Sequence, residues 1–266
     1  MSIRELLGQN EHIYLSNSLY YQKDLRRPGP FETYYRDLRE KENRQFPDEL
    51  VKKLPETPPG HPLQREWLVR KKSLDKLVHY LSQKKTVHRI LEVGCGNGWL
   101  SNRLSQALPA EICGLDVNES ELKQASNLFA GPGVSFVYGS LWEPVVPLNT
   151  FDITILASSI QYFPDLKKLI QRLREFNTTD GEIHILDSPF YDSAHESDAA
   201  RGRSRKYFKS LGFPEMADHY FHHTFNGLMN FNFSLMYNPN SFPARFQRRL
   251  MHSPLSPFPW IRIQSK

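Results

Sequence analysis

Three glycines at alternate positions, Gly94, Gly96 and Gly98, constrain this sequence more than any other feature. They follow a short apolar run at residues 88–93 and open a stretch with helical periodicity at residues 98–107. Glycine has no Cβ, so the chain can turn tightly here and a ligand can approach the backbone closely. The free N–H groups at a helix N-terminus suit a carboxylate or a phosphate. The pattern predicts a strand, a ligand-binding loop and a helix in direct succession.

Downstream of the loop, short and almost continuous apolar runs alternate with helical stretches. Strands are expected at residues 88–93, 111–116, 133–138, 151–157 and 181–187. Helices are expected at residues 98–107, 119–129, 164–175 and 194–211. Apolar runs of this kind are typical of a parallel sheet that helices cover on both faces, so we predict a doubly wound, Rossmann-like α/β fold with a mostly parallel sheet. Two later runs, 230–237 and 257–263, flank a short basic helix and are expected to add an antiparallel edge.

The N-terminal part differs from the rest of the chain in composition. Residues 1–60 are polar and aromatic, are interrupted by Pro-Gly pairs, and show no strand-like run. We therefore predict short helices there, followed by a longer helix at residues 62–83. Residues 88–187 carry twelve Asp and Glu against seven Lys and Arg, whereas both flanks are basic. Two units are expected: an N-terminal helical cap over residues 1–85 and an α/β domain over residues 86–266.

Composition excludes several classes of protein. With 39% hydrophobic and 24% charged residues and a mean hydropathy of −0.55, the chain is typical of a globular protein. No run approaches the ~18 apolar residues of a membrane span, and the first residues lack the apolar core of a secretory signal. The two cysteines are too few for a disulfide framework. A cytoplasmic location is therefore the expectation.

The net charge of +5 raises the question of a nucleic-acid partner. The densest basic runs, at residues 201–206 and 245–249, are typical of solvated helix faces. The remaining basic residues are dispersed, whereas a nucleic-acid binder is expected to gather them. We therefore expect no nucleic acid and no membrane as partner, and the sequence leaves the oligomeric state open.

The spacing of the glycines separates the possible ligands. The dinucleotide fingerprint G-x-G-x-x-G has its third glycine one place later, and a Walker loop ends in Gly-Lys-Ser/Thr. Residues 90–100 instead resemble motif I of the class I S-adenosylmethionine-dependent methyltransferases, with Glu92 two places before the first glycine. The resemblance implies that the loop wraps the methionine end of S-adenosylmethionine and that Glu92 helps to orient its amino group.

Further segments match this family in its order over residues 88–187. Residues 111–116 end in Asp116, where the resemblance places the carboxylate that binds the ribose hydroxyls. Residues 134–142 contain Ser140, where many members have an Asp that contacts the adenine. This departure weakens adenine recognition by a side chain, and the hydroxyl or the backbone at Leu141 is the expected substitute.

The next segment, residues 151–163, resembles motif IV and its following loop. On the helix before motif I, Arg70 is a candidate partner for the cofactor carboxylate, with a solvated helix face as the alternative. The residues assigned to S-adenosylmethionine are Arg70, Glu92, Gly94, Cys95, Gly96, Asn97, Gly98, Asp116, Val117, Gly139, Ser140, Leu141, Ala157 and Ser158.

Displacement at a sulfonium methyl needs an in-line nucleophile, so positioning and desolvation can supply most of the catalysis. Tyr162 is a candidate to orient the nucleophile or to pack around the methyl, with a core or rim aromatic as the alternative. His61 is a weaker candidate for a general base. Three histidines, at positions 219, 222 and 223, are expected to be packed residues, and no metal is expected.

The sequence thus favours methyl transfer to a small-molecule acceptor whose identity it does not reveal. Two alternatives stay open. One is a non-catalytic S-adenosylmethionine-binding or regulatory protein on the same scaffold. The other is a methyltransferase that acts on RNA or protein, which pI ≈ 9.1 keeps in view.

Overall fold

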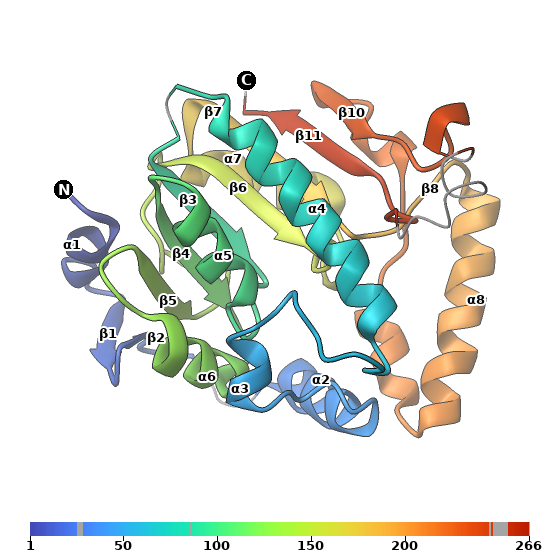
Figure 1. The fold of residues 1–266 in the computed structure, drawn as a ribbon, viewed down its shortest axis with the longest axis horizontal. Coiled ribbons are helices and arrows are strands. Elements are labelled where there is room, and N and C mark those ends of the chain that lie inside the picture. The colour runs from blue at the N-terminus through green and yellow to red at the C-terminus, as the bar shows by residue number, and fades with distance from the viewer. Residues whose placement is uncertain (26–28, 86, 245, 247–254, 266) are drawn as a thin grey trace.

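A twisted mixed sheet forms the centre of the molecule, and helices lie on both of its faces (Figure 1). The computed structural model describes residues 1–25, 29–85, 87–244, 246 and 255–265. In spatial order the strands of the sheet are β1 (Ile13–Ser16), β2 (Leu19–Gln22), β5 (Val134–Tyr138), β4 (Glu111–Asp116), β3 (Arg89–Val93), β6 (Phe151–Ala157), β7 (Asn177–Leu186), β11 (Trp260–Gln264) and β10 (Phe233–Tyr237). A separate small sheet pairs β8 (Phe190–Tyr191) with β9 (His223–Thr224).

The helices connect these strands and cover them. The α-helices are α1 (Ile3–Gly8), α2 (Pro30–Lys41), α3 (Asp48–Val51), α4 (Gln64–Ser82), α5 (Trp99–Ala107), α6 (Glu119–Phe129), α7 (Leu166–Phe176) and α8 (Ala194–Leu211). Three short 3₁₀ helices follow in the connections: η1 (Ile160–Tyr162), η2 (Pro214–His219) and η3 (Phe225–Leu228). Among the described residues, no helix combines the length and the apolar character that crossing a bilayer requires.

The predicted doubly wound core is confirmed. Strands β5, β4, β3, β6 and β7 run parallel, and the chain leaves β3 first toward β4 and later toward β6. The strand order therefore reverses beside β3, which is where open α/β sheets place their ligands, at the carboxyl ends of the strands. The predicted antiparallel edge is also confirmed, because β11 pairs with β7 and β10 pairs with β11. Most of the basic segment expected as a helix between them lies outside the described residues.

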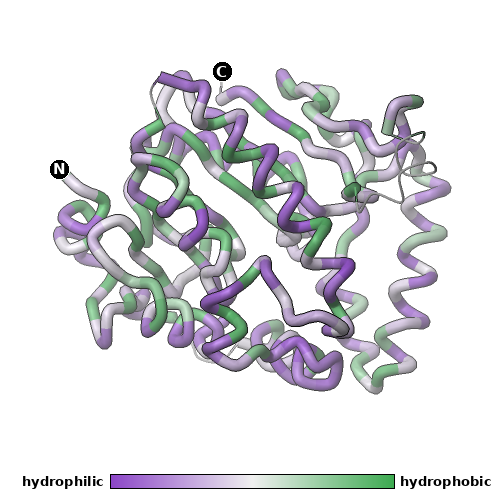
Figure 2. Tube along the Cα trace, in the orientation of Figure 1, coloured by the Kyte–Doolittle hydropathy of each residue, from purple (hydrophilic) through white to green (hydrophobic). Residues whose placement is uncertain are grey.

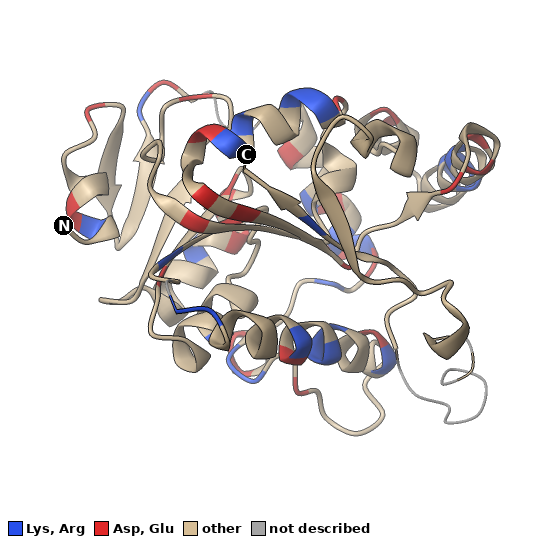
Figure 3. Cartoon of the chain, turned by 90° about the horizontal axis from the view of Figure 1, so that it is seen from above, with Lys and Arg blue, Asp and Glu red and all other residues tan. Residues whose placement is uncertain are grey.

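Two hydrophobic layers hold the helices against the sheet. The layer under α4, α5 and α6 includes Leu77, Leu104 and Leu122 and packs on buried strand residues. On the opposite face, α7 buries Leu166, Leu169, Ile170, Leu173 and Phe176, the spacing of a single helix face. Apolar residues accordingly follow the strands and inner helix faces in Figure 2. Figure 3, turned from Figure 1, shows helices on both sides of the sheet.

The expectation that residues 1–60 contain no strand is wrong. Strands β1 and β2 form a hairpin, and β2 pairs in parallel with β5, so the N-terminal segment extends the central sheet. The hairpin turn has positive φ at Asn17 (48°) and Ser18 (64°), as the tight turns between paired strands require. Each strand spans four residues, too few for an alternating pattern to stand out from its polar surroundings. Helices α2, α3 and α4 agree with the helical part of the expectation, and the division at residue 85 stays a prediction.

A smaller apolar cluster joins the N-terminal segment to α8. Leu38 of α2, Phe208 of α8 and Met216 of η2 are buried together, and Tyr162 packs against them. Helix α8 packs against η2, β8 and β9, and Figure 1 shows most of its length standing apart from the central sheet. The arrangement places α2 and α8 over the carboxyl ends of β6 and β7.

The tight packing of β4 under the glycine loop gives a stability prediction. A Cβ at Gly114 would lie 2.7 Å from the ring of Phe136 and 2.8 Å from Sγ of Cys95. We expect Gly114→Ala to lower the free energy of unfolding by about 1–3 kcal/mol, the cost of overpacking a core. Urea unfolding followed by circular dichroism measures the change.

The matched control is Gly202→Ala in α8, where an added Cβ meets no atom within 4 Å. Alanine is the better helix former by about 1 kcal/mol, so this variant should be as stable as the wild type or more so. Equal stability of the two variants would contradict the packing that the structure assigns to Gly114.

Candidate functional site

Three adjoining cavities lie at the carboxyl ends of the parallel strands. The first, of about 210 Å³, lies between β4, β5 and α2, and the second, of about 70 Å³, lies beside the glycine loop. The third, of about 480 Å³, lies between α2, α4 and α8. Tyr35 and Ser158 line all three, and Tyr162 lines the first and the third. The family resemblance would place the adenosine of the cofactor in the first cavity and its methionine in the second. We therefore call the three the adenosine cavity, the methionine cavity and the outer cavity.

The glycine loop depends on backbone without side chains. Gly94, Gly96 and Gly98 all have positive φ, at 76°, 52° and 74°. A Cβ at Gly94 would lie 2.4 Å from Cβ of Ser159, and one at Gly98 would lie 2.7 Å from the Phe136 ring. Gly94 and Gly96 line cavities, whereas Gly98 is not among the lining residues and caps α5. Packing therefore requires Gly98, and the ligand-facing surface comes from the other two.

Asp116 lines the adenosine cavity at the end of β4, as predicted. Its carboxylate accepts N–H bonds from Gly96 (2.8 Å), Val117 (2.7 Å) and Asn118 (2.9 Å). Burial raises the pKa of Asp116, while these three N–H donors act in the opposite direction. One carboxylate thus ties the glycine loop to the start of α6.

The far end of the adenosine cavity is formed by Val117, Gly139, Ser140 and Leu141, all of them predicted. The Ser140 N–H donates to Oε1 of Gln22 (2.9 Å), the last residue of the N-terminal hairpin. Glu32 of α2 accepts from the Tyr138 hydroxyl (2.8 Å) and from the backbone N–H at position 119 (2.9 Å). The N-terminal segment therefore closes this end of the cavity.

The methionine cavity brings together Glu92, Cys95, Asn97, Ala157 and Arg70. Glu92 is buried and accepts a hydrogen bond from the Ser101 hydroxyl. Burial, with a smaller contribution from the charge of Asp116, raises the pKa of Glu92 to about 8. The Glu92 side chain is therefore mostly protonated at pH 7 in this state.

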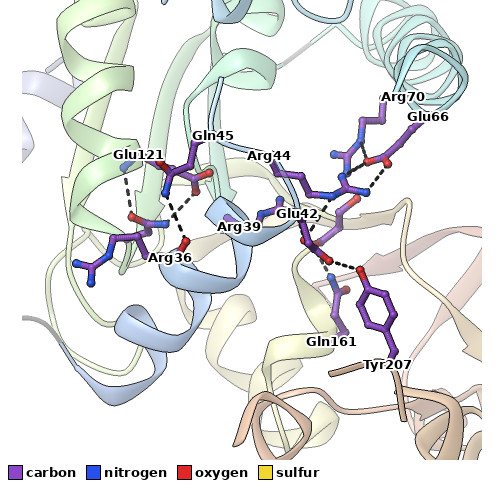
Figure 4. Close-up of polar contacts among 12 residues, drawn as sticks. Arg36, Arg39, Glu42, Arg44, Gln45, Glu66, Arg70, Glu121, Gln161 and Tyr207 are labelled. Carbon is purple, nitrogen blue, oxygen red and sulfur yellow. Dashed lines mark hydrogen bonds and ion pairs between the residues drawn. The ribbon is translucent and has the colours of Figure 1, made fainter. Parts of the chain in front are cut away.

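Between the methionine and outer cavities lies a cluster of charged residues (Figure 4). Arg44 pairs with both oxygens of Glu66, each at 2.8 Å, and Arg70 donates to the same carboxylate at 3.0 Å. Although burial opposes ionisation, these arginines lower the pKa of Glu66 to about 2. Arg70 thus lines the methionine cavity and shares its charge with Glu66, and its pairing with the cofactor carboxylate stays a prediction.

Tyr162 and Ser158 occupy the junction of the cavities. Ser158 directly follows β6 with φ at 57°, and Asp187 directly follows the neighbouring β7 with φ at 49°, which are costly conformations for residues other than glycine. The Ser158 hydroxyl donates to the carbonyl of Asp187 (3.0 Å) and fixes this pair. Burial raises the pKa of Tyr162, so its phenol stays protonated at neutral pH and can donate a hydrogen bond.

His61 is not brought to this junction. It is absent from the described residues that line the three cavities, and its Nδ1 accepts from the Leu63 N–H (3.1 Å). Two histidines of the 219–223 group are buried: Nε2 of His222 lies 3.0 Å from Oγ of Ser204, and Nε2 of His223 lies 3.2 Å from the Ile160 carbonyl. Within the described ranges, no group of three His, Cys, Asp or Glu side chains is arranged to hold a metal ion.

Sequence reasoning missed the residues that the N-terminal segment contributes. Tyr35, Arg39 and Arg44 come from α2 and the turn after it, and Glu121 comes from α6. Burial raises the pKa of Glu121 to about 7, against the opposing charge of Arg39. Tyr35 and Arg39 are four residues apart on α2, and this spacing is the sequence signal that the two side chains share one face of the helix.

Comparisons with known proteins agree with this geometry. Residues 90–181 match the family model described as a methyltransferase domain. The chain is 31% identical to malonyl-[acyl-carrier protein] O-methyltransferase of Bacillus anthracis, over 42% of this chain and 43% of that protein. It is 24% identical to an uncharacterized methyltransferase of Mycobacterium bovis, over 36% of this chain and 49% of that protein. The matches thus span about half the length of these curated relatives, or less.

A solved structure extends the similarity of the fold. Magnesium protoporphyrin IX methyltransferase of Synechocystis, with bound S-adenosylhomocysteine, superposes with a TM-score of 0.53 at 14% identity, over 88% of this chain and 98% of that one. Fold, glycine loop and family match together define the class: this chain contains a class I S-adenosylmethionine-dependent methyltransferase domain. The resemblance read from residues 88–187 is confirmed.

The raised pKa of Glu92 predicts how stability depends on pH. A carboxyl group whose pKa is higher in the folded than in the unfolded protein stabilises the fold at low pH, and this contribution is lost as pH rises from about 4.5 to about 8. Glu92→Gln cannot ionise. Its stability relative to the wild type should therefore increase between pH 6 and pH 8, by up to about 1.4 kcal/mol per pH unit.

Urea unfolding of both proteins at pH 6, 7 and 8 measures this difference, and the exposed Glu215→Gln controls for the loss of one glutamate. A constant difference between wild type and Glu92→Gln across the range would mean that Glu92 is already ionised in the fold.

Proposed function

We propose that this protein transfers the methyl group of S-adenosylmethionine to a small-molecule acceptor. The observation that carries the proposal is the meeting of three cavities at Tyr35 and Ser158. Two of them follow the family's cofactor motif, and the third opens beside them at the junction. An acceptor in the outer cavity would face the point where the methyl group is expected.

The residues present fit the cofactor. Asp116, Val117 and Leu141 line the adenosine cavity, where Asp116 would accept hydrogen bonds from the ribose hydroxyls and the other two would offer apolar surface to the adenine. Glu92 and Arg70 both line the methionine cavity. Glu92 would bind the amino group of the ligand, and Arg70 would bind its carboxylate. An ammonium group beside Glu92 would favour its ionised form, so binding is expected to release a proton there.

When bound, S-adenosylmethionine would supply a sulfonium methyl: its bond to sulfur breaks with the electron pair left on sulfur, the acceptor's lone pair forms the new bond, and the acceptor's proton passes to solvent. Tyr162 has a raised pKa, which suits hydrogen bonding to the acceptor better than proton abstraction. The aromatic walls from Tyr35 and Tyr162 would exclude water from the junction. Catalysis by positioning needs no histidine there, and His61 has no part in this proposal.

A small molecule is favoured over a macromolecule as acceptor. The outer cavity of about 480 Å³ lies within the usual range for small-molecule sites, about 300–1,000 Å³. Lys and Arg residues are spread over several elements in Figure 3 and form no continuous stripe in that view. Binding of cofactor without transfer to any acceptor would favour the regulatory alternative.

The proposal predicts cofactor-dependent stabilisation that the glycine loop controls. S-adenosylhomocysteine at about 100 times its dissociation constant adds about 2.7 kcal/mol, which should raise the melting temperature by about 5–10 °C. Gly94→Ala should abolish the rise, because alanine there is strained at φ 76° and collides with Ser159. A thermal-shift assay with S-adenosylhomocysteine, and with NAD as the comparison ligand, measures both.

Gly133→Ala is the matched control, since an added Cβ there meets no atom within 4 Å and the residue lies outside the cavities. It should keep the full ligand-dependent rise. A wild-type protein that millimolar S-adenosylhomocysteine leaves unshifted would overturn the proposed function.

A further inference from the structure

The outer cavity has walls of two kinds. Tyr35, Tyr162 and Tyr220 contribute rings, and burial raises the pKa of all three, so they are neutral surfaces. Phe208 and Phe258 extend this aromatic lining. Flat rings on several sides of one cavity suit a planar acceptor, because offset and edge-to-face contacts stabilise aromatic pairs.

Charged groups make the other wall, and positive charge is in excess there. The lining residues include four arginines and three carboxylates: Arg39, Arg44, Arg70, Arg203, Glu42, Glu66 and Asp187. Two of these arginines are satisfied within the protein, because Glu66 binds Arg44 in bidentate fashion and also accepts from Arg70. Asp187 accepts hydroxyl hydrogen bonds from Ser73 (2.7 Å) and Ser256 (3.1 Å).

Arg39 is not satisfied in this way (Figure 4). Its guanidinium lies over the Tyr35 ring, and the carboxylate of Glu42 approaches it to 3.8 Å, beyond hydrogen-bond distance. Its Nε is shielded from solvent and has no hydrogen-bond partner. Glu42 is shared further, since it also pairs with Arg44 at 3.4 Å and accepts from the Tyr207 hydroxyl. Because Arg39 lines the outer cavity and the Glu42 carboxylate lies beyond hydrogen-bond distance, an acceptor atom from a ligand in this cavity would stabilise the guanidinium.

Arg203 adds a second charge at the mouth of the same cavity. It lies on α8, is exposed, and forms no ion pair with an acidic side chain in the part of the chain that the structure describes. Arg39 and Arg203 come from α2 and α8, and both line this cavity. An anion between them would be held from both sides.

We propose that the methyl acceptor is a planar small molecule carrying an oxyanion, a carboxylate or a phosphate, that binds Arg39 and Arg203. This inference rests on the proposed function and adds the acceptor's chemical class. The aromatic wall holds the planar body beside Tyr162, and the arginine wall holds the oxyanion away from the reacting atom. Arginine suits the second task because its planar fork matches an oxyanion.

The test uses matched compounds on the full-length protein. Hydroxybenzoates and hydroxycinnamates, their primary amides and the corresponding aryl phosphates are each offered with S-adenosylmethionine, and the formation of S-adenosylhomocysteine is measured. Binding of the same compounds is measured by calorimetry on protein saturated with S-adenosylhomocysteine. We expect binding and turnover with acids or phosphates and at least about tenfold less with the amides, the usual effect of losing a hydrogen bond to a charged group.

Variants assign the effect to the two arginines. Arg39→Gln and Arg203→Gln should each raise the KM for the anionic compounds about tenfold or more while leaving the affinity for S-adenosylhomocysteine unchanged. Arg36→Gln and Arg205→Gln, on the same helices but outside the described lining of the cavity, are the matched controls and should change neither. Arg39→Lys keeps the charge and covers the case in which Arg39→Gln does not fold.

The other outcomes would overturn the acceptor class, the role of Arg39 or the proposed function. The acceptor class alone would be overturned by any of three results. The amides bind as well as the acids, the affinity for anions survives both substitutions, or no anionic compound binds while S-adenosylhomocysteine still does. Loss of S-adenosylhomocysteine affinity in Arg39→Gln would reassign Arg39 to the cofactor carboxylate and overturn its role here. Absence of S-adenosylhomocysteine binding by the wild type would instead overturn the proposed function.

Discussion

The close contact between the glycine loop and the ends of β4, β5 and β6 is the constraint on which the site depends. Gly94 lies against Ser159 and Gly98 against Phe136 at distances that leave no room for a Cβ. Asp116 at the end of β4 also holds the loop against the sheet, because its carboxylate accepts a hydrogen bond from the Gly96 N–H. Because the backbone sits this deep, the cavities open directly over the switch in strand order, and residues from β4, β5 and β6 can meet around one ligand.

The N-terminal segment turns this open edge into an enclosed site. Gln22 and Glu32 make hydrogen bonds to the loop after β5, to the end of β5 and to the start of α6. Arg44 then joins the turn after α2 to α4 through Glu66. Paired side chains with this much burial are costly to separate. The segment therefore functions as a fixed wall of the cavities, and the hairpin that anchors it is part of the central sheet.

The sequence predicted most of the α/β core because each strand there is a nearly uninterrupted apolar run between turn residues. Most of the residues assigned to the cofactor line the cavities beside the glycine loop, since backbone geometry at a glycine loop and at strand ends is local, and their contact with the cofactor stays a prediction. The hairpin was missed because four-residue strands carry too little periodicity. Arg39 and Arg44 were missed for a different reason: arginines on a helix and in the turn after it are usually solvated, and only tertiary packing brings these two to the cavities. His61 was proposed as a general base from its side-chain chemistry alone, and no local sequence feature directs it to the site.

Carboxyl groups and arginines meet beside the glycine loop in a way that suits the proposed reaction. Glu92, Asp116 and Glu121 lie on the glycine-loop side, and burial raises the pKa of each. A cationic ligand there would pair favourably with carboxyl groups whose ionisation burial otherwise opposes. Arg39, Arg44 and Arg70 line the methionine cavity beside Glu92 and Glu121 and offer their charge to anions. Transfer of a methyl group from a sulfonium bound there would remove a positive charge from the site. The aromatic lining at Tyr35 and Tyr162 favours this loss because a low dielectric stabilises the neutral thioether product more than the cation.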